Sequence, residues 1–440
     1  MCFKPYRYPH NAIEAAFEPQ PPAARIAPRN REPQQGERRA NSAIGMEDQA
    51  AAAVLAHIED QPHACLERLE ALAARGKLPI AARGAAWRLF LRAVDPQKPK
   101  SWRRALADDR SAYAKKRDDA LRRLKRVVDG AETDEALEDA ADQIRKDCER
   151  CYIDGAGEHF AESTRQKALF DALLTWHCTS GDYRQGMHEV LATIWWALER
   201  AQGAASLYCP APSSPLHALL PSADDLEADA FSLFAKLAAV TRPIFDGFDG
   251  MTPSPHRRPP AVELCDDVQG PALEAVDEEL HAHLERLEVL PQIYALSWLR
   301  TLFGRRYVAD DVCVLWDALF VDTACLAPKM VDAASLLVVW DRSALLRLNA
   351  ADDCVARLLR PPAAPAPRLL VGLLNEKTGR RLVDALRRRA ALEDVLGPSV
   401  VGAVLGPPDR TASNLSEEED DYVDAALATL CMSGGSNVGG

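Results

Sequence analysis

The chain has 440 residues, a formal net charge of −12 and 11 cysteines; 48% of its residues are hydrophobic and only 6% are aromatic. This length is enough for one large domain with tails or for two domains. The low aromatic content, beside abundant alanine and leucine, favours helices over strands. The negative charge argues against a general electrostatic grip on nucleic acid, so we expect no nucleic-acid partner.

The cysteines are scattered without regular spacing, and the N-terminal residues lack the apolar core of a signal peptide. Both features are typical of reduced thiols in the cytosol, and we expect a cytoplasmic protein. The longest apolar run lies near residues 190–198. It falls short of the roughly 20 residues that span a bilayer, so we expect no transmembrane segment.

Three regions follow one another along the chain. Residues 1–45 are rich in proline, arginine, glutamine and alanine, which predicts a disordered N-terminal tail. Helical patterns predict one domain over residues 46–360. The C-terminal extension, residues 361–440, contains a proline-rich linker, a basic helix and an acidic tail, in that order.

The first predicted helices of the domain are structural. Residues 81–94 carry Arg83, Trp87 and Leu91 at helical spacing, and we assign Arg83 and Trp87 a packing role. Residues 101–128 have the pattern of a long polar helix with clustered lysine and arginine. We interpret these cations as a solvated face; a basic surface for acidic membrane or for a partner is the alternative. Later helices are predicted at about 271–288, 290–304 and 309–321.

The first candidate site lies at the end of a helix that we expect to begin with Thr133 as its N-cap. Residues three apart on a helix are neighbours, so Asp147 can orient the guanidinium of Arg150. Ile144 points toward the core and anchors the same turn. The helix is expected to break directly afterwards, at residues 153–157. An arginine held in this way is positioned to project into another molecule.

The second candidate site lies about three dozen residues downstream. Residues 180–182 are turn residues, and an apolar helix is predicted from Met187. Tyr183, Arg184 and Gln185 therefore lie on the lip of a helix, where side chains can meet a partner. Glutamine is a poor acid or base, but it both donates and accepts hydrogen bonds. That suits it to orient a water molecule or to grip a backbone.

Together the two stretches resemble the paired signature of the TBC domain of Rab GTPase-activating proteins, Ile-x-x-Asp-x-x-Arg followed by Tyr-x-Gln-Gly. The matching residues are Ile144, Asp147 and Arg150 in the first motif and Tyr183, Gln185 and Gly186 in the second.

Further matches occur in the order that the family shows. They are the Arg-x-x-x-Trp of residues 83–87, the tryptophan-containing helix of residues 294–303 and the Leu-Trp-Asp-x-x-Phe of residues 315–320. The resemblance covers roughly residues 75–360, and the combination is specific where any single piece would be weak. Residues 183–189 and 316–320 are similar to the branch associated with late-endosomal Rab proteins and retromer.

The resemblance implies an all-α fold, with a single large multi-helix TBC-type domain, and activation of a Rab-family small GTPase. It makes Arg150 an arginine finger and Gln185 a glutamine finger, both supplied in trans. Asp147 would hold Arg150, while Tyr183 and Gly186 would fix the glutamine loop. The chain would catalyse no reaction of its own and carry no cofactor, because GTP and Mg²⁺ are carried by the partner. The lack of a P-loop-type phosphate loop agrees with this expectation.

Other interpretations stay open at this point. The alternative function is a catalytically silent helical scaffold that binds a small GTPase or a vesicle-coat protein. For His188 and Glu189 the resemblance implies a packing or partner-contact role. Endosomal membranes and coat proteins are further candidate partners, which would place the protein at the periphery of endomembranes.

Overall fold

A computed structural model describes residues 54–204 apart from 56 and 59, then 214–245, 258–360 and 364–376, and five positions between 383 and 390. Within these residues the chain is helical and contains no β-strand, which confirms the all-α fold. The tail predicted at residues 1–45 and the acidic C-terminal tail lie outside the described residues.

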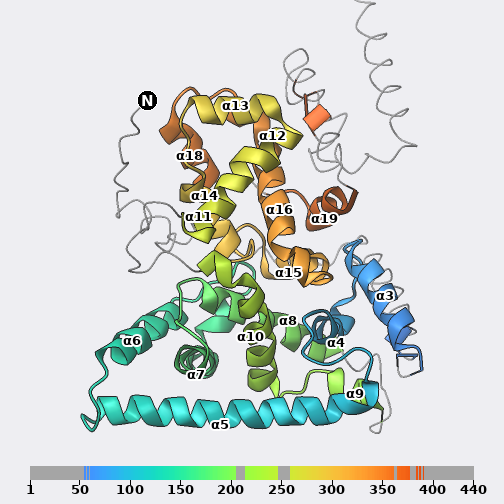
Figure 1. The fold of residues 1–440 in the computed structure, drawn as a ribbon, viewed down its shortest axis with the longest axis vertical. Helices are drawn as coiled ribbons and strands as arrows, with labels where there is room; N and C mark the ends of the chain where they lie inside the picture. Colours follow the sequence, from blue (N-terminus) through green and yellow to red (C-terminus); the bar gives the residue numbers. More distant parts are fainter. Residues whose placement is uncertain are drawn as a thin grey trace, which may run out of the picture.

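The N-terminal half of the domain forms the lower part of Figure 1. Its helices begin with α3 and α4, continue through the long α5 and the two site-bearing helices α6 and α8, and end with α10. In chain order they are α3 (Pro62–Ala73), α4 (Ile80–Phe90), η1 (Pro99–Ser101), α5 (Trp102–Val128), α6 (Glu135–Glu149), η2 (Glu158–Ala161), α7 (Ser163–Thr179), α8 (Met187–Ala204), α9 (Pro215–Leu219) and α10 (Leu226–Phe245).

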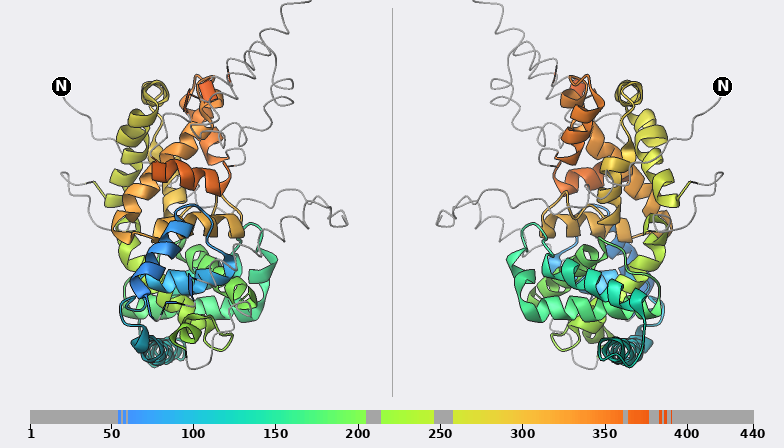
Figure 2. Two further views of the ribbon diagram at one scale, coloured as in Figure 1. Left: turned by 90° about the vertical axis from the view of Figure 1, so that its right-hand side faces the viewer. Right: turned by 90° about the vertical axis from the view of Figure 1, so that its left-hand side faces the viewer.

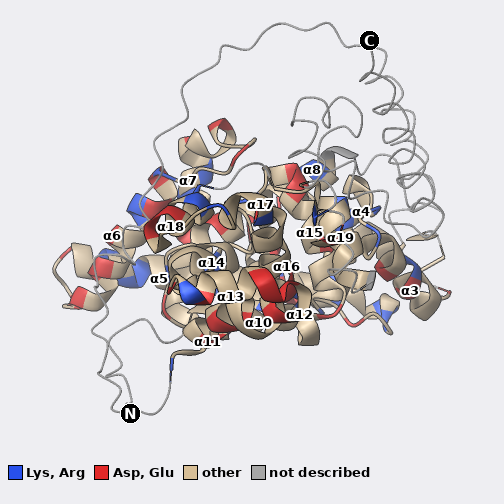
Figure 3. Cartoon of the chain, turned by 90° about the horizontal axis from the view of Figure 1, so that it is seen from above, with Lys and Arg blue, Asp and Glu red and all other residues tan. Residues whose placement is uncertain are grey.

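The α5 helix runs along the lower edge of the molecule and is seen end on in Figure 2. Its buried side chains lie on one face, which packs against α7 and α10. Part of its basic face is paired rather than solvated. Arg110 binds Asp229 of α10 at 2.9 Å, and Arg117 binds Glu227 at 3.1 Å. Viewed from above, basic and acidic residues are interspersed over the helices (Figure 3). On α5 itself, Arg122 pairs with Asp119 of the same helix, so its cations are mixed with acidic side chains.

A small apolar cluster fixes α6, the helix that leads to Arg150, against its neighbours. It joins α5, α6 and α7 and is separate from the main core; its buried members are Ala120, Val127, Leu137, Ala141 and Leu174. Ile144, nearer the end of α6, is fully buried in the main core instead. The two ends of α6 are therefore held by different sets of apolar contacts.

The C-terminal half forms the upper part of Figure 1. Its longest helix, α16, has 15 residues, and most of the others pack around it. In chain order they are α11 (Pro260–Asp267), η4 (Val268–Ala272), α12 (Leu273–Val276), α13 (Glu278–Arg286), α14 (Pro291–Arg300), α15 (Ala309–Phe320), η5 (Thr323–Cys325), α16 (Leu326–Trp340), α17 (Arg342–Leu345), α18 (Ala351–Leu359) and α19 (Pro367–Glu376).

The helix predicted over residues 271–288 is wrong as one continuous element. The chain is helical before Asp277 and again after it, but Asp277 has non-helical dihedral angles, with φ −145° and ψ 86°. Its side chain accepts a hydrogen bond from the Leu280 N–H at 3.2 Å, which makes it the N-cap of α13. An aspartate inside an apolar-periodic stretch can start a new helix as readily as it can extend an old one.

The α16 helix is the element to compare with the expectation that no segment spans a membrane. Among the described residues, Thr323–Trp340 is the one helical stretch long and apolar enough, by length and composition, to cross a membrane. Of this stretch, 56% is buried inside the fold, where α16 packs against α12, α14, α15 and α19. Burial on several sides accounts for its apolar sequence, because a helix surrounded by others has little polar face.

The last described helix, α19, was not predicted from the sequence. It lies beyond residue 360 and packs against α15 and α16. Its Leu370, Val371 and Leu373 are buried in the main core. The proline-rich composition of the preceding residues conceals it, because Pro367 occupies the first position of the helix, where a proline is tolerated.

Candidate functional site

The candidate finger residue stands where α6 ends. The helix begins at Asp134, whose carboxylate accepts a hydrogen bond from the Leu137 N–H at 3.1 Å; the prediction of Thr133 as the N-cap was wrong by one residue. The last helical residue is Glu149. Arg150 is the C-cap, with φ −99° and ψ 11°, so its side chain leaves from the end of the helix rather than from its flank.

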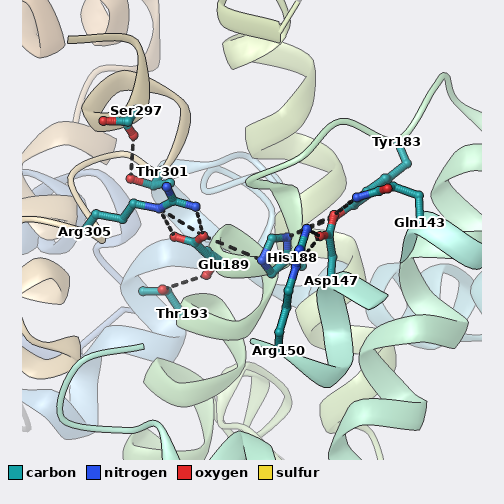
Figure 4. Close-up of polar contacts among 10 residues, drawn as sticks. All are labelled: Gln143, Asp147, Arg150, Tyr183, His188, Glu189, Thr193, Ser297, Thr301 and Arg305. Atoms are coloured by element: carbon teal, nitrogen blue, oxygen red, sulfur yellow. Dashed lines mark hydrogen bonds and ion pairs between the residues drawn. The ribbon is translucent and has the colours of Figure 1, made fainter. Parts of the chain in front are cut away.

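One carboxylate holds Arg150 in place (Figure 4). The Nε and Nη2 atoms of Arg150 donate to the same oxygen of Asp147, Oδ1, at 3.0 and 2.5 Å. The Asp147 side chain is fully buried, whereas 41% of the Arg150 side chain is exposed. The guanidinium is thus anchored on one side and open to solvent on the other, where its remaining N–H groups can meet a partner.

The second oxygen of Asp147 joins the two sequence motifs. Asp147 Oδ2 accepts from the Tyr183 hydroxyl at 2.6 Å and from Gln143 Nε2 at 3.0 Å. Arg150 and the segment that carries Gln185 are therefore positioned by one buried group, although 36 residues separate Asp147 from Tyr183.

The charge of Asp147 is maintained by its donors. Burial by itself raises the pKa of this carboxyl, but His188 and the hydrogen bonds from Tyr183, Gln143 and Arg150 hold it below its usual value. Burial lowers the pKa of His188, so this imidazole is neutral near pH 7. At neutral pH the hydrogen bonds from these three side chains are therefore what keeps Asp147 ionised.

His188 extends the network from Tyr183 into α8. Its Nδ1 lies 2.9 Å from the Tyr183 hydroxyl. An ionised Asp147 can only accept, so the hydroxyl donates to Asp147 and accepts from Nδ1–H of His188. Burial, together with the Asp147 charge, raises the pKa of Tyr183 well above its usual value, which keeps this hydroxyl protonated. The packing role expected for His188 is thus supplemented by a hydrogen bond that orients Tyr183.

Glu189 ties the start of α8 to the C-terminal half. It accepts hydrogen bonds from Arg305 Nη2 at 2.6 Å and from Arg305 Nε at 3.1 Å (Figure 4). Arg305 lies in the turn after α14, where Leu302 and Phe303 have positive φ values of 45° and 67°. Both of these side chains are fully buried, so the core holds the turn in a conformation that non-glycine residues rarely adopt.

The glutamine loop turns sharply just before α8. Gly186 has φ +101°, a conformation that favours glycine, and its carbonyl accepts the N–H groups of Glu189 and Val190 at 3.1 and 3.2 Å. The Tyr183 N–H donates to His177 Nδ1 at 3.3 Å. Gln185 is half-buried, and its side chain makes no hydrogen bond to any described residue. Its amide can therefore bind an incoming group.

A cavity of about 570 Å³ lies beside the same loop. Residues 180–182, Arg184 and Met187 line one side of it, and α5 and α10 line the others, with the rings of Tyr113 and Phe231 among the apolar walls. The loop is therefore supported by α8 and by the Asp147 network more than by packing on this side.

Sequence reasoning named six residues here, and the structure brings Asp147, Arg150 and Tyr183 into direct contact. Gly186 and Gln185 adjoin them along the chain, and Ile144 anchors the turn.

Three supporting residues were missed. Gln143 precedes Asp147 by four positions, a helical spacing that could have identified it. His177 reaches the loop through the Tyr183 N–H, six residues along the chain. No local signal identifies Arg305, because it reaches Glu189 from 116 residues away.

A family model and several known proteins match this chain. Residues 81–340 match the family described as the Rab-GTPase-TBC domain. The chain is 30% identical over 318 residues to TBC1 domain family member 5 of Homo sapiens, covering 64% of this chain and 39% of that protein. It is 34% identical over 241 residues to the Mus musculus protein of the same name, covering 50% of this chain and 29% of that protein. The aligned part is thus well under half of each relative.

A solved structure supports the fold. The crystal structure of the Ypt/Rab-GAP domain of Gyp1p superposes with a TM-score of 0.54 and 18% sequence identity. The alignment covers 73% of this chain and 93% of that one. At this level of identity the likeness establishes the fold alone.

Proposed function

Because this chain belongs to the Rab-GTPase-TBC domain family, we propose that it accelerates GTP hydrolysis by a Rab-family small GTPase. The GTPase supplies the nucleotide, its Mg²⁺ and the phosphate cradle. This chain supplies side chains in trans and needs no cofactor of its own. The observation that carries the proposal is a half-exposed guanidinium, Arg150, held by a fully buried carboxylate, Asp147.

Arg150 is the arginine finger in this mechanism. Negative charge on the transferring phosphoryl group and the β/γ-bridging oxygen is stabilised in the transition state by a cation placed there in advance. Asp147 contacts two of the guanidinium nitrogens on one side, so the planar fork presents its other N–H groups outward. Such a finger contributes about 10³–10⁵ in rate.

Gln185 is the glutamine finger. Its amide can accept a hydrogen bond from the attacking water and donate one to the partner's backbone, which fits its lack of a hydrogen-bonding partner among the described residues. The Tyr183–Asp147 hydrogen bond places this loop beside Arg150, so both fingers enter the partner together. Holding reactants in line converts binding energy into rate.

We also propose a cellular location. The similarity of residues 183–189 and 316–320 to the late-endosomal branch suggests a cytoplasmic protein that acts at the surface of endosomal membranes. Late-endosomal Rab proteins are therefore the first substrates to test. Endosomal coat proteins are candidates for additional partners.

The test is single-turnover GTP hydrolysis by a panel of purified Rab proteins, with the wild type beside Arg150→Ala, Arg150→Lys and Gln185→Ala. We expect stimulation of one or a few Rabs, lost by at least about 10³-fold in Arg150→Ala. Arg150→Lys should be nearly as weak, because lysine keeps the charge but loses the planar fork.

A matched control lies on the same helix. Arg145 is also paired three residues back, with Asp142 at 3.1 Å, but it sits on the exposed flank of α6. Arg145→Ala should retain full stimulation. Wild-type rates from Arg150→Ala would reject the arginine-finger assignment. Tight GTPase binding without any acceleration would instead favour a silent scaffold.

A further inference from the structure

An exposed aromatic ring stands two residues beyond the finger. Tyr152 is 67% exposed, which is unusual for a large apolar side chain in an otherwise well-packed domain. Among the large hydrophobic side chains that are exposed in the described residues, Tyr152 is the aromatic one; the others are Val128, Val240, Leu290 and Val308. Interfaces use such rings as anchors, because tyrosine offers a large rigid contact area at a small entropic cost.

The local backbone forces this ring outward. The neighbours on each side, Cys151 and Ile153, are only 6% and 3% exposed. Because both neighbours are buried in the core, the Tyr152 side chain between them is left facing solvent. The loop is then fastened to α15 by a hydrogen bond from the Ala309 N–H to the Asp154 carbonyl at 2.8 Å.

The ring packs on Gly157, a glycine that the backbone conformation does not require. Gly157 has φ −58° and ψ −44°, dihedral angles that any residue adopts. A Cβ atom at this position would instead overlap the Tyr152 ring. The absence of a side chain at Gly157 thus leaves the space that the ring occupies.

A second apolar side chain continues the surface. Val308, just before α15, is 38% exposed. It adjoins the loop at Gly155, where a Cβ atom would lie 3.4 Å from the Val308 Cβ. We call these four residues, Tyr152, Gly155, Gly157 and Val308, the Tyr152 platform.

Chain geometry connects the platform to the finger. Two residues span at most about 7 Å, so the Cα atoms of Arg150 and Tyr152 cannot be further apart than that. When Arg150 reaches a phosphate inside its partner, Tyr152 must therefore lie at the partner's surface. We propose that the Tyr152 platform is a docking anchor that seats an apolar patch of the GTPase beside its nucleotide site. This inference rests on the proposed function, which it extends from the chemistry of hydrolysis to recognition.

Kinetics separate an anchor from a finger. With the GTPase that the panel identifies, Tyr152→Ala should raise the half-saturating concentration of this protein about 10-fold to 30-fold, the loss typical of an interface aromatic. The maximal rate should stay within about twofold of wild type, because the anchor acts equally before and in the transition state. Tyr152→Phe should behave as wild type. Arg150→Ala should show the opposite pattern, with binding kept and the maximal rate lost.

Two further variants separate the position of the ring from exposed apolar surface in general. Gly157→Ala should displace the ring without unfolding the protein, since an exposed ring can move aside. It should remove about half of the binding free energy that Tyr152→Ala removes. Val128→Ala is the matched control. Val128 is also 67% exposed, but it ends α5, at the opposite end of α6 from Arg150, so its replacement should change nothing.

Direct binding makes the outcomes distinguishable. Affinity for the GTPase loaded with a non-hydrolysable GTP analogue is measured in the Arg150→Ala background, with and without Tyr152→Ala. Unchanged affinity and an unchanged half-saturating concentration would overturn the platform and leave the arginine finger intact. If the wild type binds a Rab but stimulates none, and Tyr152→Ala weakens that binding, the activating function is rejected and the docking anchor is supported. A panel in which no Rab binds the wild type would overturn both.

Discussion

At the scale of single residues, Asp147 determines the geometry of the candidate site. Its two oxygens accept four hydrogen bonds, two from Arg150, one from Tyr183 and one from Gln143. A buried carboxylate of this kind is stable only because its donors replace the water that it has lost. The same bonds hold Arg150 and the segment that carries Gln185 to one buried group.

Replacing that carboxylate by an amide tests its role. Asp147→Asn keeps the volume but removes the charge and gives Arg150 a neutral partner, so the guanidinium should lose its fixed orientation. We expect single-turnover stimulation to fall about 10²-fold, the cost of a misplaced catalytic group, with GTPase binding retained. Asp142→Asn, the equivalent change at the exposed pair on α6, is the control. Full activity of Asp147→Asn would show that Arg150 needs no positioning.

Replacing Gly186 tests whether the glutamine loop depends on its backbone conformation. A side chain at φ +101° costs about 1–3 kcal/mol of stability. Space is not the limit, because the nearest atom to an added Cβ would be 3.7 Å away, on Arg300. Gly186→Ala should therefore lower the free energy of unfolding by that amount in a denaturant titration and reduce stimulation as well. Gly372→Ala, at a helical glycine with open space around it, should not destabilise the protein.

At the scale of elements, polar contacts link three parts of the chain that pack side by side. They run from α6 through Tyr183 and His188 to the start of α8, and from Glu189 to the turn after α14. The Trp316 indole N–H braces that turn from α15 by donating to the Leu302 carbonyl at 2.7 Å. The α6 helix and the C-terminal half are thus connected through the start of α8.

His188 makes this connection sensitive to acid. Burial lowers its pKa from the ordinary value of 6.5, and the Glu189 and Asp147 carboxylates oppose that shift without overcoming it. Below pH 6.5 the unfolded chain therefore binds a proton that the folded chain resists. The stabilising contribution is complete above that pH and is lost as the pH falls through the lower pKa of the folded state.

The change to test is His188→Asn, which retains a hydrogen-bond donor but does not titrate. Its unfolding free energy should decline less steeply than that of the wild type between about pH 7 and pH 5. Urea titrations at several pH values measure the slope. His63→Asn, the same replacement at a histidine of α3 whose side chain is 73% exposed, is the matched control. Parallel curves for His188→Asn and wild type would contradict the assignment.

At the scale of the whole molecule, a buried ion pair joins the two halves of the domain. Arg83 of α4 donates two hydrogen bonds to Asp317 of α15, both 2.9 Å long, and the Trp87 indole N–H donates to the same carboxylate at 2.8 Å. Arg83 is 3% exposed and Asp317 is fully buried. The packing role predicted for Arg83 and Trp87 agrees with these contacts.

Removing one member of that pair should destabilise the entire domain. Asp317→Ala leaves a guanidinium buried without its counter-charge, which costs about 3–5 kcal/mol. Arg200→Ala breaks a surface ion pair with Asp310 instead and should cost at most about 1 kcal/mol. Denaturant unfolding of both variants measures the difference. Equal losses of unfolding free energy in the two variants would show that burial does not determine how strongly an ion pair stabilises the domain.

Short-range patterns in the sequence were sufficient to predict the local contacts of the site and several of the helices. The spacing of Asp147 and Arg150 determines that they meet on a helix, because neighbours at three positions need no tertiary contact. The apolar periodicity of residues 309–321 likewise predicted α15 to within one residue of its observed end at Phe320. The break at Asp277 was missed, since capping and helix continuation compete locally and the packing of α12 and α13 decides between them.

Only the tertiary structure decided which distant residues share the site. The motifs identified Tyr183, but not that its hydroxyl binds Asp147, and nothing local identifies Arg305 or shows that the Tyr152 ring faces solvent. Such contacts depend on how helices pack, and packing is determined by the complementary shape of many side chains at once. The same reason applies to α16: its composition alone fits a membrane span, and its burial among neighbouring helices is a property of the folded domain.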